Sequence, residues 1–179
     1  AVESPDAFRR VVDRLLASPH YGEKWGRHWL DVARYADSNG LDENLAYVNA
    51  FRYRNYVIDA FNEDKPYDDF VREQLAGDEL VKPPYAELPP EGIDRLIATG
   101  FLRMAPDGTG GGADDLNLAR NEVMAGTLNI VSTSLLGMTV GCAQCHDHRY
   151  DPIPPPDYYS LRAIFEPAYN WNAWRAPTA

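Results

Sequence analysis

This 179-residue chain is poor in cysteine and in basic residues, and it lacks long hydrophobic runs. Its two cysteines imply no disulfide framework of the kind that small secreted domains use. The 17 Lys and Arg residues are outnumbered by 27 Asp and Glu residues, and the net charge of −10 argues against nucleic acid or an anionic membrane as a partner. No apolar run approaches the roughly 18 residues of a membrane-spanning helix, so we expect no membrane span in this segment.

The N-terminal sequence AVESPDAFRR also lacks the cationic start and apolar centre of a signal peptide. Since the chain begins with Ala1 rather than Met, we expect it to be cut from a larger multidomain protein, with any export signal outside it. The length and the absence of a linker-like stretch predict one compact domain over residues 1–179. Hydrophobic residues make up 45% of the chain, which is ample for a core.

Helical periodicity dominates the sequence, and there is no convincing pair of strands. A first helix is predicted after Ser4 and Pro5, and a second within residues 18–40. The apolar stripe of the first comprises Phe8, Val11, Val12, Leu15 and Leu16. The shared face of the second comprises Trp25, His28, Trp29, Val32 and Ala36.

The rest of the chain is also predicted to be helical, with long proline-rich and glycine-rich loops at 81–92 and 106–115. We expect the glycine-rich loop to be flexible. The further predicted helices are a pair within 49–80 that breaks at residues 64–66 and ends at Gly77, a short helix over 92–105, a long helical stretch over 114–148, and a last helix after a proline turn at 151–156. The predicted fold class is therefore all-α, a single compact multi-helix domain.

Both cysteines stand in the sequence Cys-Ala-Gln-Cys-His at residues 142–146, which is the C-x-x-C-H pattern of covalent haem attachment. Cysteines three residues apart on a helical turn point to one side, so each can form a thioether with one vinyl group of the same porphyrin. The adjacent histidine then reaches the iron. We predict haem c as the cofactor, with Cys142 and Cys145 as its tethers and His146 as the proximal iron ligand.

Three other interpretations of the motif stay open. A thioredoxin-like redox pair would want a strand before the motif, where the sequence predicts a helix. A structural zinc site could use Cys142, Cys145, His146 and His148, although four ligands within seven residues fit a tetrahedron badly. The third interpretation is a buried pair of cysteines without a function.

The residues after the motif are consistent with a haem ligand. The second ring nitrogen of His146 needs an acceptor, and we expect it among the carbonyls of Asp151, Pro152 and Ile153. His148 lies too close to His146 to reach the opposite face of the same iron, so we expect a hydrogen-bonding or surface histidine there.

The sixth iron ligand is predicted to be His28, with His20 as the second choice. His28 lies on the apolar face of the second predicted helix, where a buried imidazole needs a partner. Met104, Met138 and an empty position are the alternatives, and an empty position would permit ligand chemistry.

Two further groups of residues are candidates for binding. Arg52 and Arg54 could pair with the haem propionates, although ordinary surface ion pairs also explain them. A calcium loop is a weaker hypothesis, because Gly40 falls two places too early for an EF-hand. Its oxygen-bearing residues would be Asp37, Asn39, Asp42 and Glu43.

Several long blocks of the chain, including SPHYGEKWGRHWLDVARYADSNG and LLGMTVGCAQCHDHRYDPIPPPDYYSL, resemble the planctomycete cytochrome-like domain family, the second of two such types. The resemblance covers nearly the whole chain. It implies an extracytoplasmic or periplasmic haem-c domain within larger proteins, beside other cytochrome-like domains and sometimes carbohydrate-binding modules. It implies no established reaction.

The sequence therefore predicts a c-type cytochrome domain that acts in electron transfer or redox sensing, with other redox proteins or neighbouring cytochrome-like domains as partners. One alternative is a haem enzyme or gas sensor with an open distal site. Another is a structural zinc-binding or interaction module. Electron transfer is favoured over catalysis.

Overall fold

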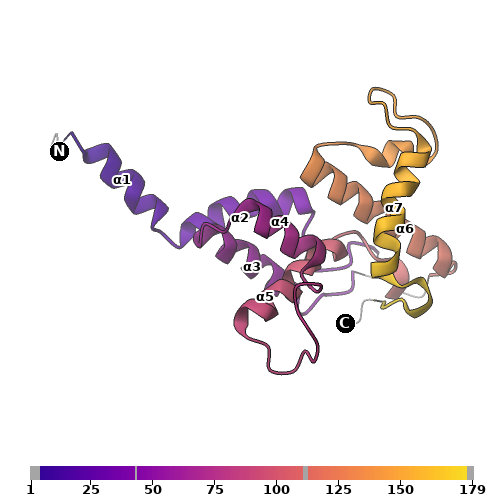
Figure 1. Cartoon of the computed structure of the whole chain (residues 1–179), viewed down its shortest axis with the longest axis horizontal. Coiled ribbons are helices and arrows are strands. Elements are labelled where there is room, and N and C mark those ends of the chain that lie inside the picture. Colours follow the sequence, from indigo (N-terminus) through magenta and orange to yellow (C-terminus); the bar gives the residue numbers. More distant parts are fainter. Residues whose placement is uncertain (1–4, 43, 111–112, 177–179) are drawn as a thin grey trace. The chain divides into compact units, whose positions relative to one another are not determined.

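The computed structural model describes residues 5–42, 44–110 and 113–176 (Figure 1). The α-helices are α1 Ala7–Leu16, α2 His20–Ala33, α3 Phe51–Asn62, α4 Tyr67–Ala76, α5 Pro90–Ala98, α6 Leu116–Val131 and α7 Pro155–Tyr169. The described residues contain no strand, and their single β-bridge joins Ser38 to Ala46. The prediction of an all-α fold is confirmed. Within these same residues, no helix is both long and apolar enough to cross a bilayer.

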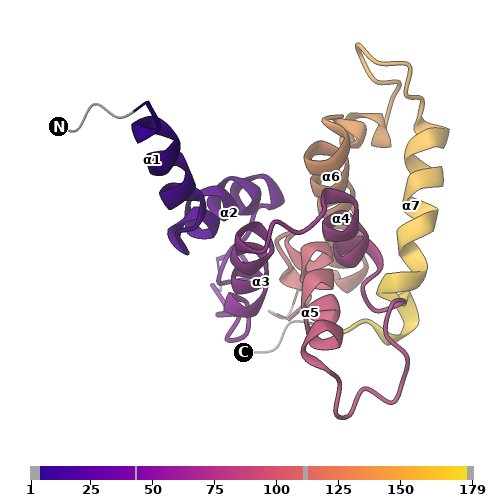
Figure 2. The same cartoon turned by 60° about the vertical axis from the view of Figure 1, so that its left-hand side comes forward.

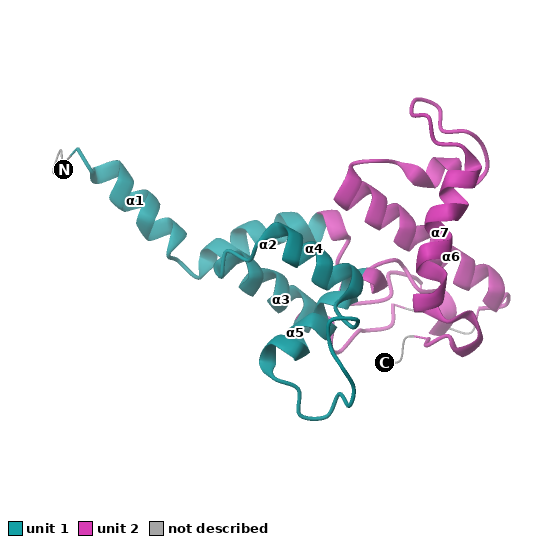
Figure 3. Cartoon of the chain, viewed as in Figure 1, with its two compact units in different colours: residues 1–31, 52–101 teal, residues 32–51, 102–179 magenta. Residues whose placement is uncertain are grey.

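The chain divides into two compact units, coloured separately in Figure 3. Unit 1 comprises Ala1–Asp31 and Arg52–Phe101, and unit 2 comprises Val32–Phe51 and Leu102–Ala179. The chain enters each unit twice. The single domain that we expected stays a prediction, and each unit is described by itself below.

In unit 1, α2 approaches α3 through glycines. Gly22 and Gly26 are buried, and a Cβ built on Gly22 would lie only 2.2 Å from the Ile58 carbonyl oxygen. The side chain of Asn62 fixes this contact by accepting from the Gly22 amide at 2.7 Å and donating to the Pro19 carbonyl at 3.0 Å. Close approach of two helix backbones requires small residues at the contact.

The apolar face predicted for α2 is therefore largely wrong. Trp25 and Val32 are 47% and 46% exposed, His28 is exposed, and only Trp29 among the large residues of that face is partly buried within the helix. Ala36 lies beyond the end of α2 and is also exposed. The physical reason is that the glycines, which carry no hydrophobic signal, occupy the face that packs.

A buried hydrogen-bond network joins α2, α3 and α4 in unit 1. Trp29 Nε1 donates to the Tyr53 hydroxyl at 3.0 Å and to Gln74 Oε1 at 3.1 Å. The Tyr53 hydroxyl donates to the same Oε1 at 2.5 Å, and Gln74 Nε2 donates to the Phe70 carbonyl at 3.1 Å. Gln74 is 1% exposed, and burial raises the pKa of Tyr53. The amide of Gln74 thus satisfies polar groups of Trp29 and Tyr53 inside unit 1.

Replacing Gln74 with methionine is expected to lower the free energy of unfolding by about 2 kcal/mol, because the similar volume is kept while the Tyr53 hydroxyl loses its acceptor. Urea unfolding followed by far-UV circular dichroism measures the change. Gln144→Met is the matched control, since the Gln144 side chain makes no hydrogen bond with the described residues, and it should stay within about 0.5 kcal/mol of the native chain. Equal losses in both variants would contradict the role given to the network.

Unit 2 builds its core between α6 and α7. Leu128 of α6 packs with Val140, Ala143, Ile153 and Tyr158, and all five side chains are buried. Both views of the chain show α6 and α7 side by side, with the segment that joins them extending beyond the helix ends (Figures 1 and 2). This connecting segment carries the C-x-x-C-H sequence.

The long helical stretch predicted over 114–148 is interrupted. Helix α6 ends at Val131, a π-helical turn covers Ser132–Leu136, and Gly137 closes it in the left-handed conformation with φ of 65°. The motif then begins on a separate 3-10 turn, Val140–Gln144. Glycine adopts a positive φ at no steric cost, which is why the chain can turn at Gly137.

The apolar stripe of α1 is exposed, since α1 contains no buried residue and Phe8 is 80% exposed. Its predicted cap Ser4 lies outside the described residues, and the helix follows Asp6. In the glycine-rich loop, Asp107 and Thr109 are buried and hydrogen-bonded to each other at 2.5 Å. Residues 111–112 lie outside the described residues, and the expected flexibility of the loop stays a prediction.

Candidate functional site

Two thiols are presented to solvent, one by Cys142 within the 3-10 turn Val140–Gln144 and one by Cys145, the residue directly after it. Val140 and Ala143 point into the core of unit 2, and Ala143 is 0% exposed. Cys142 and Cys145 are both exposed, and neither is in a disulfide. Since a 3-10 helix has three residues per turn, side chains three positions apart eclipse one another. Val140 and Ala143 therefore face the core, whereas Cys142 and Cys145 face solvent.

His146 follows the second thiol and is itself exposed. Its Nδ1 lies 2.8 Å from the carbonyl oxygen of Asp147, which can only accept, so Nδ1 carries the proton and donates. In the neutral imidazole the lone pair is then on Nε2, and no described residue forms a hydrogen bond with Nε2. Such a backbone acceptor sets the tautomer of a ligating imidazole. The acceptor predicted among residues 151–153 is wrong, because the carbonyl of the next residue already fills this role.

His148 closes the loop that follows. Its Nδ1 accepts from the backbone amide of Asp151 at 2.9 Å, and its Nε2 lies 2.8 Å from the Thr139 hydroxyl. The backbone amide of His148 donates to the Ile153 carbonyl at 2.9 Å. The side chain is 5% exposed. The prediction of a hydrogen-bonding histidine is confirmed, and His148 has no free nitrogen with which to bind a metal.

The residues of the motif do not assemble into a closed metal site. In the described part of the chain, no three His, Cys, Asp or Glu side chains are grouped so that they could hold a metal ion. Because both nitrogens of His148 are bonded within the loop, the proposed zinc site of two cysteines and two histidines is not formed. Covalent haem binding requires two thiols and one ligating nitrogen, which differs from the requirement of a closed metal site.

The residues considered for calcium stabilise a turn. Asn39 is buried, accepts from the Leu45 amide at 2.9 Å and donates to the Asp107 carbonyl at 3.3 Å. Asp37 accepts from the Tyr35 hydroxyl at 2.5 Å. Glu43 lies outside the described residues. Calcium binding by this segment stays a prediction.

The predicted distal and propionate residues belong to unit 1, whereas the motif belongs to unit 2. His28 is exposed, and its ring is tilted against that of Trp25 with centroids 5.5 Å apart, so the expectation that it is buried is wrong. His20 is exposed and lies 2.8 Å from the Glu23 carboxylate. Arg52 is exposed, and Arg54 lies 3.4 Å from the Asn55 amide oxygen. Their roles towards a haem stay predictions.

Helix α7 contributes residues that the sequence did not single out. The Tyr159 hydroxyl donates to the Gln144 carbonyl at 3.2 Å and so ties the 3-10 turn to α7. Tyr158 is 0% exposed beneath the turn, and burial raises its pKa. Arg162 joins α7 to α6 by donating to the Asn121 side chain at 2.6 Å. The signal available in the sequence was the tyrosine pair that follows the proline turn.

Met138, a candidate iron ligand, instead packs against the core cluster of unit 2.

These features define an all-α protein that displays a C-x-x-C-H turn on its surface. The chain belongs to the family described as PSCyt2, a protein of unknown function (DUF1549), whose model matches residues 1–170. No curated protein and no solved structure matches the chain. Membership of this family therefore assigns no activity to the chain.

Proposed function

We propose that this chain is a c-type cytochrome domain that binds one haem covalently through Cys142 and Cys145, with His146 as an iron ligand. The observation that carries the proposal is the segment formed by the 3-10 turn and its C-cap, where two exposed free thiols, Cys142 in the turn and Cys145 directly after it, precede the exposed imidazole of His146. A structural cysteine pair would be expected to be buried, because free cysteine behaves as a small hydrophobic residue.

The chain's own residues hold the site ready for this group. Val140 and Ala143 anchor the turn in the core, and Tyr159 holds its Gln144 carbonyl. The Asp147 carbonyl accepts from Nδ1 of His146, so the lone pair of the neutral imidazole is on Nε2. Each thiol would add across a vinyl group, with no leaving group. When bound, haem supplies a reversible one-electron couple.

Electron transfer or redox sensing is the activity that we infer for such a domain. The net charge of −10 supports a transient partner with a basic face, because complementary charge accelerates encounter. Partners of this kind include other redox proteins and neighbouring cytochrome-like domains. The proposal also carries the location that the family resemblance implies, outside the cytoplasm.

The test is production of the chain in a host that attaches haem covalently, followed by intact mass spectrometry. We expect the mass of one haem to be added per chain and to survive acid denaturation, with a Soret band in the visible spectrum. The control is the same chain made without the attachment machinery, which should carry no bound haem. Unmodified mass in both preparations would overturn the proposal.

The same material separates electron transfer from ligand chemistry. A six-coordinate iron refuses carbon monoxide, whereas an open distal position binds it. Refusal is expected for an electron-transfer domain. Rapid carbon monoxide binding would favour the haem enzyme or gas sensor instead.

A further inference from the structure

An aromatic cavity of about 230 Å³ lies in unit 1, between α2, the end of α3 and the start of α4. This volume is just below the roughly 300 Å³ at which the usual range of ligand pockets begins, so a bound molecule would be small. Nothing in the proposed haem site uses the cavity, since the C-x-x-C-H motif belongs to unit 2. Five of the eight residues that line it are aromatic: Tyr21, Trp29, Phe61, Tyr67 and Phe70.

Packing and hydrogen bonds hold the rings of this cavity in place. Phe70 is buried, and the ring planes of Trp29 and Phe61 are inclined to its plane at 71° and 67°. The indole of Trp29 is also fixed by its hydrogen bonds to Tyr53 and Gln74. Walls inclined to one another suit a compact group better than a flat one, which stacks best between parallel rings. Because the walls are positioned before a ligand arrives, little ordering is needed on binding.

Solvent reaches the aromatic cavity near the turn between α3 and α4. Tyr67, the first residue of α4, is 62% exposed, and Asp64 in the turn is also exposed. Both residues belong to the lining. The carboxylate of Asp64 forms no hydrogen bond or ion pair with the described residues. A ligand that enters from solvent therefore meets an exposed ring and an unpaired negative charge.

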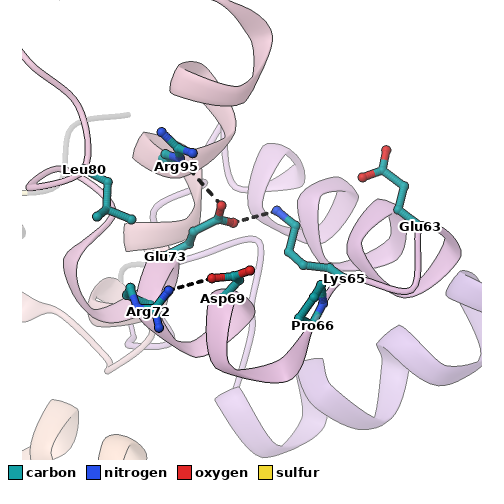
Figure 4. Close-up of a pocket in the computed structure, with 8 residues that line it drawn as sticks. All are labelled: Glu63, Lys65, Pro66, Asp69, Arg72, Glu73, Leu80 and Arg95. Atoms are coloured by element: carbon teal, nitrogen blue, oxygen red, sulfur yellow. Dashed lines mark hydrogen bonds and ion pairs between the residues drawn. The ribbon is translucent and has the colours of Figure 1, made fainter.

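Lys65 is the other charged residue of the lining, but its ammonium group is directed elsewhere. Its Nζ lies 2.6 Å from Glu73 Oε2, as the dashed line in Figure 4 shows, and 4.9 Å from the centroid of the Tyr56 ring. Among the described residues that line the aromatic cavity, neither Glu73 nor Tyr56 is present, so Lys65 contributes its apolar stem to the wall. Because Glu73 compensates the charge of Lys65, the charge that remains at the cavity is the negative one of Asp64.

We propose that the aromatic cavity binds a small organic cation, an alkylated ammonium group such as that of choline. The face of an aromatic ring attracts a cation through its quadrupole, and cages of such rings recognise quaternary ammonium groups. The carboxylate of Asp64 adds the attraction of an opposite charge. An anion would be repelled by Asp64, and a neutral apolar molecule would gain nothing from that charge or from the ring quadrupoles.

The test compares choline with dimethylbutanol, the uncharged analogue in which carbon replaces the quaternary nitrogen, by NMR titration of the Trp29 indole N–H signal in the full chain. Choline is expected to bind about ten-fold more tightly, because the two molecules have the same shape and only the cation interacts with the rings and the carboxylate. Equal or tighter binding of the alcohol would overturn the proposal, because the cavity would then select apolar surface alone. The absence of a saturable shift with choline would overturn it as well.

One pair of variants tests the charge. Asp64→Asn keeps the shape of the side chain and removes its charge, and asparagine tolerates the left-handed backbone of this residue, whose φ is 52°. Choline affinity is expected to fall about five-fold. The matched control is Asp59→Asn, which removes an exposed carboxylate of α3 outside the lining and should change the affinity less than about two-fold. Equal losses in the two variants would show general electrostatic attraction and would contradict a built site.

A second pair of variants tests the rings. Tyr67→Ala removes an exposed ring from the aromatic cavity, whereas Tyr85→Ala removes a ring of similar exposure, 55%, that is not part of the lining. We expect choline affinity to fall about five-fold in the first variant and less than about two-fold in the second. Because both side chains are exposed, far-UV circular dichroism should show an unchanged fold. Unchanged choline affinity in Tyr67→Ala would contradict the assignment of this ring to the site.

Discussion

Replacing His146 with alanine is expected to change the visible absorption bands that depend on imidazole bound to the iron of the haem-loaded chain. The haem itself is expected to stay covalently bound. The thiols depend on a turn anchored by Val140 and Ala143, and His146 takes no part in that anchoring. Because His146 is exposed, free imidazole in solution should reach the vacated position and restore the spectrum. Visible spectra with and without imidazole, together with intact mass, measure both parts of the prediction.

His148→Ala is the matched control, since the two histidines stand two residues apart and have different partners. This variant loses the contacts to Thr139 and Asp151, so we expect a loss of about 2 kcal/mol in the free energy of unfolding with the iron spectrum unchanged. A spectral change in His148→Ala that free imidazole reverses would contradict the assignment of His146 as the proximal ligand. The absence of a spectral change in His146→Ala would contradict it as well.

The spacing of the motif was predictable from the sequence, whereas its hydrogen bonds were not. C-x-x-C-H places two thiols one short turn apart in any helical conformation, so the prediction needed only local geometry. The acceptor of His146 depends on backbone dihedrals at Asp147, and the partner of His148 is Thr139, which lies nine residues earlier. Contacts of this kind are set by how the loop folds back on the core of unit 2.

Helix boundaries marked by proline and glycine were also predictable. The break between α3 and α4 at residues 64–66 and the end of α4 at Gly77 are confirmed. Proline restricts the backbone conformation of the residue before it, which is a purely local effect.

The packing face of α2 was not predictable from hydrophobicity, since Gly22 and Gly26 pack by letting two backbones approach. The core of unit 1 is polar at Gln74 for a similar reason, because three partners on different helices meet there.

Gly77 is expected to be important for the stability of unit 1, because there is no space for a side chain at this position. Its φ is −61°, so no left-handed conformation requires a glycine there. Space is the reason instead: a Cβ would lie 2.0 Å from the Arg95 carbonyl oxygen and 2.4 Å from that of Glu73. Gly77→Ala is expected to lower the free energy of unfolding by about 3 kcal/mol, because two backbones must separate to admit the methyl group. Urea unfolding and hydrogen exchange of the α4 and α5 amides measure the loss.

For Gly92→Ala in the same unit, we expect the opposite change in the free energy of unfolding. Gly92 is buried in α5, yet its added Cβ would meet side-chain atoms of Leu88 and Pro89 at 3.5 Å, which is ordinary contact. Alanine is the better helix former, so this variant should gain about 0.5 to 1 kcal/mol. Two glycine-to-alanine changes thus differ in sign because one faces backbone and the other faces side chains. If Gly77→Ala were as stable as Gly92→Ala, α4 and α5 would not be in close backbone contact at Gly77.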